Sequence, residues 1–173
     1  MRLLSQATTG AGMTPHIVKV ALALILAVAH GASAFACDVP AQVAELRAAL
    51  LTSVNEVRRA SGLRPFQHDP RLEVAAQAHA CENAGLGRIS HRSADGRKLQ
   101  DRVSQAGYAW GRVAENIAAG QPGVAAVLGD WMNSRPHRRN LLMPALAASG
   151  IGIARLPDGR IVWVINMASP KVE

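Results

Sequence analysis

The sequence predicts an α+β domain with an antiparallel sheet. In the first part of the domain, apolar residues recur at three- and four-residue steps, which predicts helices. The end of the chain is instead rich in β-branched residues and is divided by an Asp-Gly turn, which predicts a hairpin. Helices followed by strands, with one short strand between them, are typical of this class. A chain of 173 residues fits one such domain.

The first two helices have the clearest signals. Residues 40–61 form one apolar stripe that includes Leu46, Leu50 and Val54, and Gly62 ends it. Residues 69–85 begin with Asp69 and Pro70, an N-cap followed by the proline that suits a first turn.

The remaining elements are shorter. A helix is expected over residues 97–105, a strand over 113–118, and helices over 122–133 and 136–142. Strands are expected over residues 149–154 and 160–167, joined through Asp158 and Gly159.

Residues 1–36 resemble a secretory signal peptide rather than part of the domain. Basic Arg2 and Lys19 precede a short apolar run, and small residues follow it. Cleavage is expected after Ala34 or Ala36, which leaves residues 37–173 as the domain. The apolar run is short for a bilayer span, so we expect a secreted or periplasmic protein with no transmembrane segment once the signal is removed.

Cys37 and Cys81 are the two cysteines of the chain. In an exported protein they are expected to form a disulfide. Loop entropy assigns such a bond roughly 4 kcal/mol for a loop of about 45 residues. The alternative is lipidation of Cys37 after cleavage at Ala36, but the preceding residues lack the leucine-like side chain that lipoprotein signals favour.

The formal net charge of +7 is dispersed along the chain, and aromatic residues make up 3%. A nucleic-acid groove would need clustered cations and stacking rings, so we expect no nucleic-acid partner. Weak attraction to an anionic envelope or cell wall is the better interpretation of the charge. We expect a monomer.

Polar residues stand out at three places among small or turn-forming neighbours: Ser90-His91, Glu115-Asn116 and His137. If the fold brings them together, two imidazoles and one carboxylate could hold zinc or another divalent metal, or an anionic ligand. Such a metal would keep open positions for water, as hydrolysis requires.

The chain from Leu50 to Ala168 resembles the CAP superfamily (cysteine-rich secretory proteins, antigen 5 and pathogenesis-related proteins; SCP domain), in its bacterial branch. The matching pieces occur in order along the chain: residues 54–58, 69–72 with 75–79, 90–91, 101–102 with 106–108, 114–117, 131–134 with 137–142, and 150–154. The resemblance implies a three-layer αβα sandwich with a central antiparallel sheet. It also implies that His91 and Glu115 line one cleft, to which His137 is added.

The sequence departs from the family pattern at Ser134, Ala148 and Ile165, where relatives carry other polar groups. Because few anionic ligands remain, we interpret the site first as a polar pocket and only second as a metal centre. The favoured function is a ligand-binding module at the cell envelope, for a small apolar, lipid-like or wall-derived ligand. The alternative is a divalent-metal-dependent, peptidase-like hydrolase that uses His91, Glu115 and His137. A vestigial cleft in a structural or signalling protein is the third hypothesis.

Each candidate also has a purely structural interpretation. His91 and Glu115 could be a hydrogen-bonded pair that joins a loop to the sheet, and His137 could serve local capping. Asn116 is expected to hold the backbone of its loop. We expect His79 to be a core histidine and His68 to be exposed. Trp131 and Trp163 are expected in the core, and Tyr108 and Trp110 are expected to form a partly exposed aromatic lip.

Overall fold

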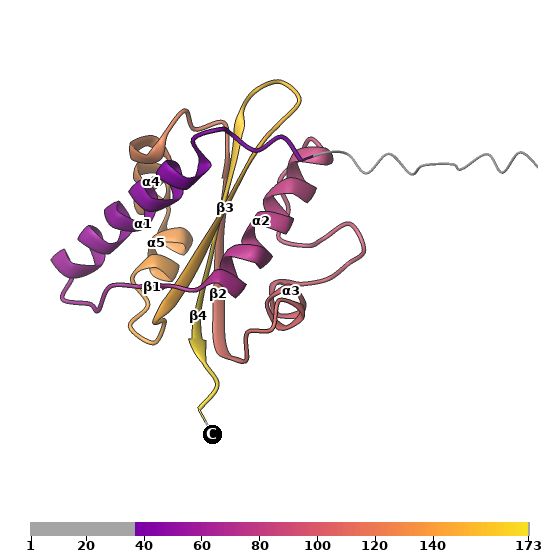
Figure 1. Ribbon diagram of the computed structural model, residues 1–173. Helices are drawn as coiled ribbons and strands as arrows, with labels where there is room; N and C mark the ends of the chain where they lie inside the picture. The colour runs from indigo at the N-terminus through magenta and orange to yellow at the C-terminus, as the bar shows by residue number, and fades with distance from the viewer. Residues whose placement is uncertain (1–36, 173) are drawn as a thin grey trace, which may run out of the picture. The chain divides into compact units, whose positions relative to one another are not determined.

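The computed structural model describes residues 37–172 (Figure 1). The predicted signal peptide lies outside these residues. The described chain contains five helices and four strands: α1 (Val43–Ala60), β1 (Gln67–His68), α2 (Pro70–Gly85), α3 (Leu99–Gln105), β2 (Trp110–Ala119), α4 (Val124–Asn133), α5 (Arg135–Leu141), β3 (Ala148–Arg155) and β4 (Ile161–Pro170). Within residues 37–172, no helix has both the length and the apolar character needed to cross a bilayer.

The domain has the predicted three layers. The four strands form one sheet in the order β1-β3-β4-β2. Figure 1 shows α1, α4 and α5 on one face of this sheet and α2 and α3 on the other. The largest core cluster fills the first interface and includes both tryptophans predicted to be buried, Trp131 and Trp163.

The prediction of an antiparallel sheet was wrong at one strand. β2 pairs antiparallel with β4, and β3 with β4, but β1 runs parallel to β3. Only two residues, Gln67 and His68, form β1. Two residues are too few to show an alternating pattern, so no strand was expected here, and tertiary contacts impose the parallel pair.

The terminal hairpin was predicted correctly. β3 and β4 pair from Ala148 opposite Ala168 to Arg155 opposite Ile161. Gly159 adopts a φ of +85°, a left-handed conformation that glycine takes without a steric penalty, and its N–H donates to Leu156 O at 2.9 Å.

Helix α2 packs backbone to backbone against β3. A Cβ added at Gly150 would lie 2.0 Å from Glu73 N, and one added at Gly152 would lie 2.2 Å from Ala76 C. Glycine at these two positions and alanine on the facing side of α2 therefore set how closely helix and sheet approach.

The structure confirms the disulfide between Cys37 and Cys81, whose Cα atoms lie 5.2 Å apart. With its sulfur in this bond, Cys37 has no thiol left for lipidation. The next residue is also attached to the sheet, because Arg155 N donates to Asp38 O at 2.7 Å.

The predicted aromatic lip was only partly right. Trp110 is half-buried and donates to Ser104 Oγ at 2.9 Å, but Tyr108 is buried. Tyr108 belongs to the cluster between α2, α3 and the sheet, and the guanidinium of Arg71 lies 4.9 Å from its ring centroid. Packing against these neighbours overrides the turn-rich local sequence.

Candidate functional site

Glu115 is the centre of the candidate site. It lies on β2, directly opposite Asn166 of β4, and its side chain is 2% exposed. A carboxylate is rarely buried unless its charge is paired and its oxygens are hydrogen-bonded. The contacts of its two oxygens therefore decide what Glu115 can do.

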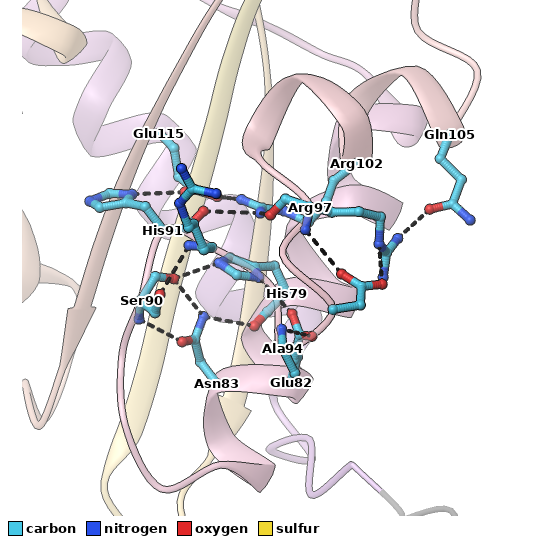
Figure 2. Close-up of polar contacts among 12 residues, drawn as sticks. His79, Glu82, Asn83, Ser90, His91, Ala94, Arg97, Arg102, Gln105 and Glu115 are labelled. Atoms are coloured by element: carbon cyan, nitrogen blue, oxygen red, sulfur yellow. Dashed lines mark hydrogen bonds and ion pairs between the residues drawn. The ribbon is translucent and has the colours of Figure 1, made fainter.

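Both oxygens of Glu115 have partners from distant parts of the chain. Oε1 lies 2.9 Å from His91 Nδ1, and Oε2 accepts from Arg102 Nη2 at 2.7 Å. The orientation of the Asn166 amide that satisfies its neighbours adds a donor 3.1 Å from Oε2. Figure 2 shows His91 and Arg102 reaching Glu115 from different segments.

The loop that carries His91 is attached to α2. His79 Nε2 lies 2.7 Å from Ser90 O, and Asn83 accepts from Ser90 N at 2.7 Å (Figure 2). His79 is fully buried, as predicted for a core histidine, and His68 is exposed, as predicted. Ser90 Oγ accepts from Arg92 N at 3.0 Å, a local turn contact.

Arg102 of α3 also holds the loop that carries His91. Arg102 of α3 donates through Nη1 to His91 O at 3.1 Å while its Nη2 binds Glu115. One guanidinium therefore fixes both the backbone of His91 and the carboxylate that His91 contacts. The planar fork of arginine suits this double role.

The two histidines of the site have opposite protonation tendencies. The hydrogen bond to Glu115 raises the pKa of His91 above its ordinary value and outweighs the partial burial of the ring. Burial lowers the pKa of His137, and the charge of nearby His91 lowers it further. The site therefore favours a charged imidazole at His91 and a neutral one at His137.

Asn116 serves the scaffold rather than the exposed surface. It is fully buried, and its Nδ2 donates to His137 O at 3.1 Å. Asn140 Nδ2 in turn donates to Asn116 Oδ1 at 3.0 Å and to Glu115 O at 3.3 Å. These bonds attach α5 to β2. The prediction that Asn116 holds the backbone of its own loop was therefore wrong, because Asn116 lies on a strand and holds the backbone of another element.

The proposed metal ligands do not form a metal-binding group. Within residues 37–172, no three His, Cys, Asp or Glu side chains lie close enough together to hold a metal ion. Both oxygens of Glu115 are engaged, one of them by a guanidinium that already neutralises the charge a cation would need. His91 and His137 alone lack the third ligand of a hydrolytic zinc site.

The sequence did not assign roles to Arg102 and Asn166, which hold Glu115 in place. Arg102 belongs to the matched residues 101–102, but no partner could be named for it. Asn166 is the single polar residue in an otherwise apolar strand from Ile161 to Ala168. A buried polar residue within such a run needs a partner, and that was the available signal.

His91, the outer residue of the site, is open to solvent. The side chain of His91 is 63% exposed. His91, Glu115 and His137 are absent from the walls of five cavities of the described domain.

Comparisons with known proteins agree with this architecture. The chain is 30% identical to the uncharacterized protein YkwD of Bacillus subtilis over 113 residues, which is 65% of this chain and 44% of YkwD. Two solved structures are similar, each with a TM-score of 0.67. An outer surface protein of Borrelia burgdorferi is 21% identical, and the match covers 72% of this chain and 92% of that one. An extracellular protein of Bacillus anthracis that contains an SCP domain is 25% identical, with 75% and 42% covered.

The chain thus spans less than half the length of YkwD and of the Bacillus anthracis protein. The pattern of the Cysteine-rich secretory protein family, CAP, matches residues 51–167, well over half of the chain. With the three-layer fold and the ordered motifs, this match shows that the chain belongs to the CAP family.

Proposed function

We propose that this protein is an exported ligand-binding module of the cell envelope, and that the surface around His91 contacts a ligand with an acidic group. Lipid head groups and wall polymers both offer carboxylates or phosphates. The disulfide and the extracellular Bacillus anthracis relative support export.

One observation carries the proposal: an exposed imidazole rests on a buried, fully paired carboxylate. The side chain of Glu115 is 2% exposed, whereas that of His91 is 63% exposed. A pair that served only to join a loop to the sheet would not need its outer member in solvent. Because Nδ1 of His91 is held by Glu115, Nε2 is the ring atom left to meet a ligand.

The neighbouring helix adds positive charge to this surface. Asn116 attaches α5 to β2 beside Glu115, and α5 carries Arg135, Arg138 and Arg139. These three arginines are exposed and form no ion pair with any residue from 37 to 172. The same helix carries His137, whose pKa is lowered by burial and by the charge of His91, so these unpaired cations lie on an element close to His91 and favour an anionic ligand.

The metal-dependent hydrolase is not the function that this geometry favours. Glu115 would have to leave Arg102 and Asn166 to act as a metal ligand or base, which would leave a buried guanidinium unpaired. A direct check is zinc titration followed by thermal unfolding. We expect no stabilisation, and a rise in Tm that His91→Ala abolishes would support the hydrolase instead.

Ligand titration followed by NMR of the histidine rings tests the binding module. The probes are decanoate, as a lipid-like carboxylate, and poly(glycerol phosphate), as a wall-like phosphate. At least one probe should shift the His91 ring resonances, and His91→Ala should weaken its binding about tenfold, equivalent to 1.4 kcal/mol. Arg92→Ala is the matched control, since it removes one exposed positive charge from the adjacent residue and should change affinity less than twofold.

The two probes distinguish the source of the acidic group. Binding of decanoate alone indicates a lipid-like ligand, and binding of the phosphate polymer alone indicates a wall-derived one. If neither probe shifts the His91 ring, or if both variants weaken binding equally, the surface around His91 is not a specific site and the proposal fails.

A further inference from the structure

A cavity of about 350 Å³ lies away from His91, between α1 and the free edge of β3. Its walls include Ala44, Ala48 and Leu51 of α1 and Ser149, Gly150 and Ile151 of β3. Its volume is within the range of small-ligand sites, and its walls are mainly apolar with a few polar groups, as in such sites.

The edge of β3 beside this cavity is paired in three different ways. Asp69 N donates to Ser149 O at 2.9 Å next to the short strand β1, and Arg155 N donates to Asp38 O at 2.7 Å. Between them, the side-chain amide of Gln77 makes the two hydrogen bonds that a neighbouring strand would otherwise make. Its Nε2 donates to Ile153 O and its Oε1 accepts from Ile153 N, both at 3.0 Å.

Ile151 is left without a partner on this edge. In an antiparallel pair, backbone groups point alternately toward and away from the neighbouring strand. The backbone N–H and C=O of Ile153 point away from β4 and bond Gln77. The backbone groups of Ile151, two residues earlier on the same strand, therefore also point away from β4. No hydrogen bond from residues 37–172 reaches its N–H or C=O on this side.

Two side-chain atoms at the cavity also lack partners. The side chain of Ser149 shares the α1-facing side of β3 with Ile151. Ser149 is 1% exposed, and its Oγ makes no hydrogen bond. Arg47 Nε is likewise buried and unpartnered, although Nη1 binds Glu73 at 2.7 Å and Nη2 binds Gln77 at 2.5 Å.

Buried polar groups in native proteins are hydrogen-bonded in the great majority of cases. Here a backbone donor, a backbone acceptor, a hydroxyl and a guanidinium N–H all lack partners around one cavity. Glu73 pairs with Arg47 at 2.7 Å, and its other oxygen lies 2.9 Å from Nε2 of His68, which also lines the cavity. With a neutral imidazole at His68 the site carries no net charge, so the missing partner is polar but neutral.

We propose that this cavity binds a neutral amide, a peptide unit or carboxamide with a small apolar group attached. Gln77 provides the template, because a carboxamide already fills the equivalent position at Ile153 with one donated and one accepted hydrogen bond. A ligand amide would form the same pair with Ile151, and its apolar group would contact Ala48 and Leu51. This site is separate from the surface around His91 and does not depend on the proposed function.

The test uses the whole secreted domain and N-acetyl-L-alanine methylamide as probe. The methyl ester of N-acetyl-L-alanine is the matched ligand, with one amide replaced by an ester. Amide NMR spectra should show the diamide shifting Ile151 N–H, with the ester binding at least threefold more weakly. Before any ligand is added, Ile151 N–H should exchange with solvent at least tenfold faster than Ile153 N–H, which Gln77 protects.

A pair of variants separates the cavity from the rest of the surface. Ala48→Phe places a ring in the cavity from an exposed position of α1 and should weaken diamide binding at least tenfold. Ala49→Phe, at the next exposed residue of the same helix and outside the cavity wall, should leave binding unchanged. Both variants should unfold at similar urea concentrations to the parent.

Some results would overturn this inference and leave the proposed function intact. They are a protected Ile151 N–H, equal effects of the two phenylalanine variants, or diamide shifts that map to His91 instead of Ile151. Millimolar diamide with no shift at Ile151 would mean that water alone satisfies these groups, and would also overturn it. Loss of acid-probe binding at His91, by contrast, would affect only the proposed function.

Discussion

Replacing Glu115 with glutamine should destabilise the fold by about 3 kcal/mol. Glu115 and Arg102 are 2% and 4% exposed and lie 2.7 Å apart. Removing the negative charge leaves a buried guanidinium whose Nε already lacks a partner, and such unpaired buried charges cost roughly 3–5 kcal/mol. Because the amide retains one oxygen as acceptor, we expect the lower end of this range.

Neutralising both partners should restore much of this loss. Arg102→Met removes the cation that Glu115→Gln leaves unpaired, so the double variant contains no uncompensated buried charge. We expect the two effects to be non-additive by at least about 1 kcal/mol. The control Asp158→Asn disrupts an exposed ion pair with Arg160 and should change stability far less.

Urea unfolding at pH 7 measures these differences through the fluorescence of the buried tryptophans Trp131 and Trp163. Glu115→Gln should lower the midpoint without changing the slope, since the same surface is exposed on unfolding. A loss below about 1 kcal/mol, or strictly additive effects in the double variant, would contradict the view that Glu115 is held by a buried charge pair.

Three further predictions test separate features. Gly152→Ala should cost about 2–3 kcal/mol in a urea titration, because its Cβ would overlap the α2 backbone; a neutral effect would contradict the close packing. In an NMR titration, His91 should titrate above its ordinary pKa and return toward it in Glu115→Gln; its stabilising contribution is complete below the unfolded pKa of about 6.5 and is lost as pH rises through the folded value. Replacing Cys37 and Cys81 with serine should cost up to roughly 4 kcal/mol in thermal unfolding, and an unchanged Tm would show that the bond adds no stability.

Local signals were sufficient for most of the elements. Asp69 and Pro70 predicted the start of α2, and Asp69 Oδ1 does accept from Arg71 N at 2.9 Å. The Asp158-Gly159 turn and the β-branched residues around it predicted the hairpin of β3 and β4. These features depend on neighbours within a few residues, so the sequence displays them directly.

What the sequence did not reveal depends on long-range partners. β1 consists of two residues whose pairing is decided by β3, about 80 positions later in the chain. Arg102 and Asn166 meet at Glu115 only because α3 and β4 both adjoin β2. Ion pairs of this kind are chosen by the packing of whole elements, so residue type alone predicts that a partner exists but not which one.

The way α2 holds the loop of Ser90 and His91 has a consequence for the kinetics of binding. His79 and Asn83 attach this loop to a helix whose backbone rests directly on β3, so the loop is anchored to one of the most tightly packed elements of the domain. A ligand at His91 would therefore meet a surface that is already formed and has no lid to close. Association should show a single phase, with a rate that rises linearly with ligand concentration and no slow rearrangement afterwards.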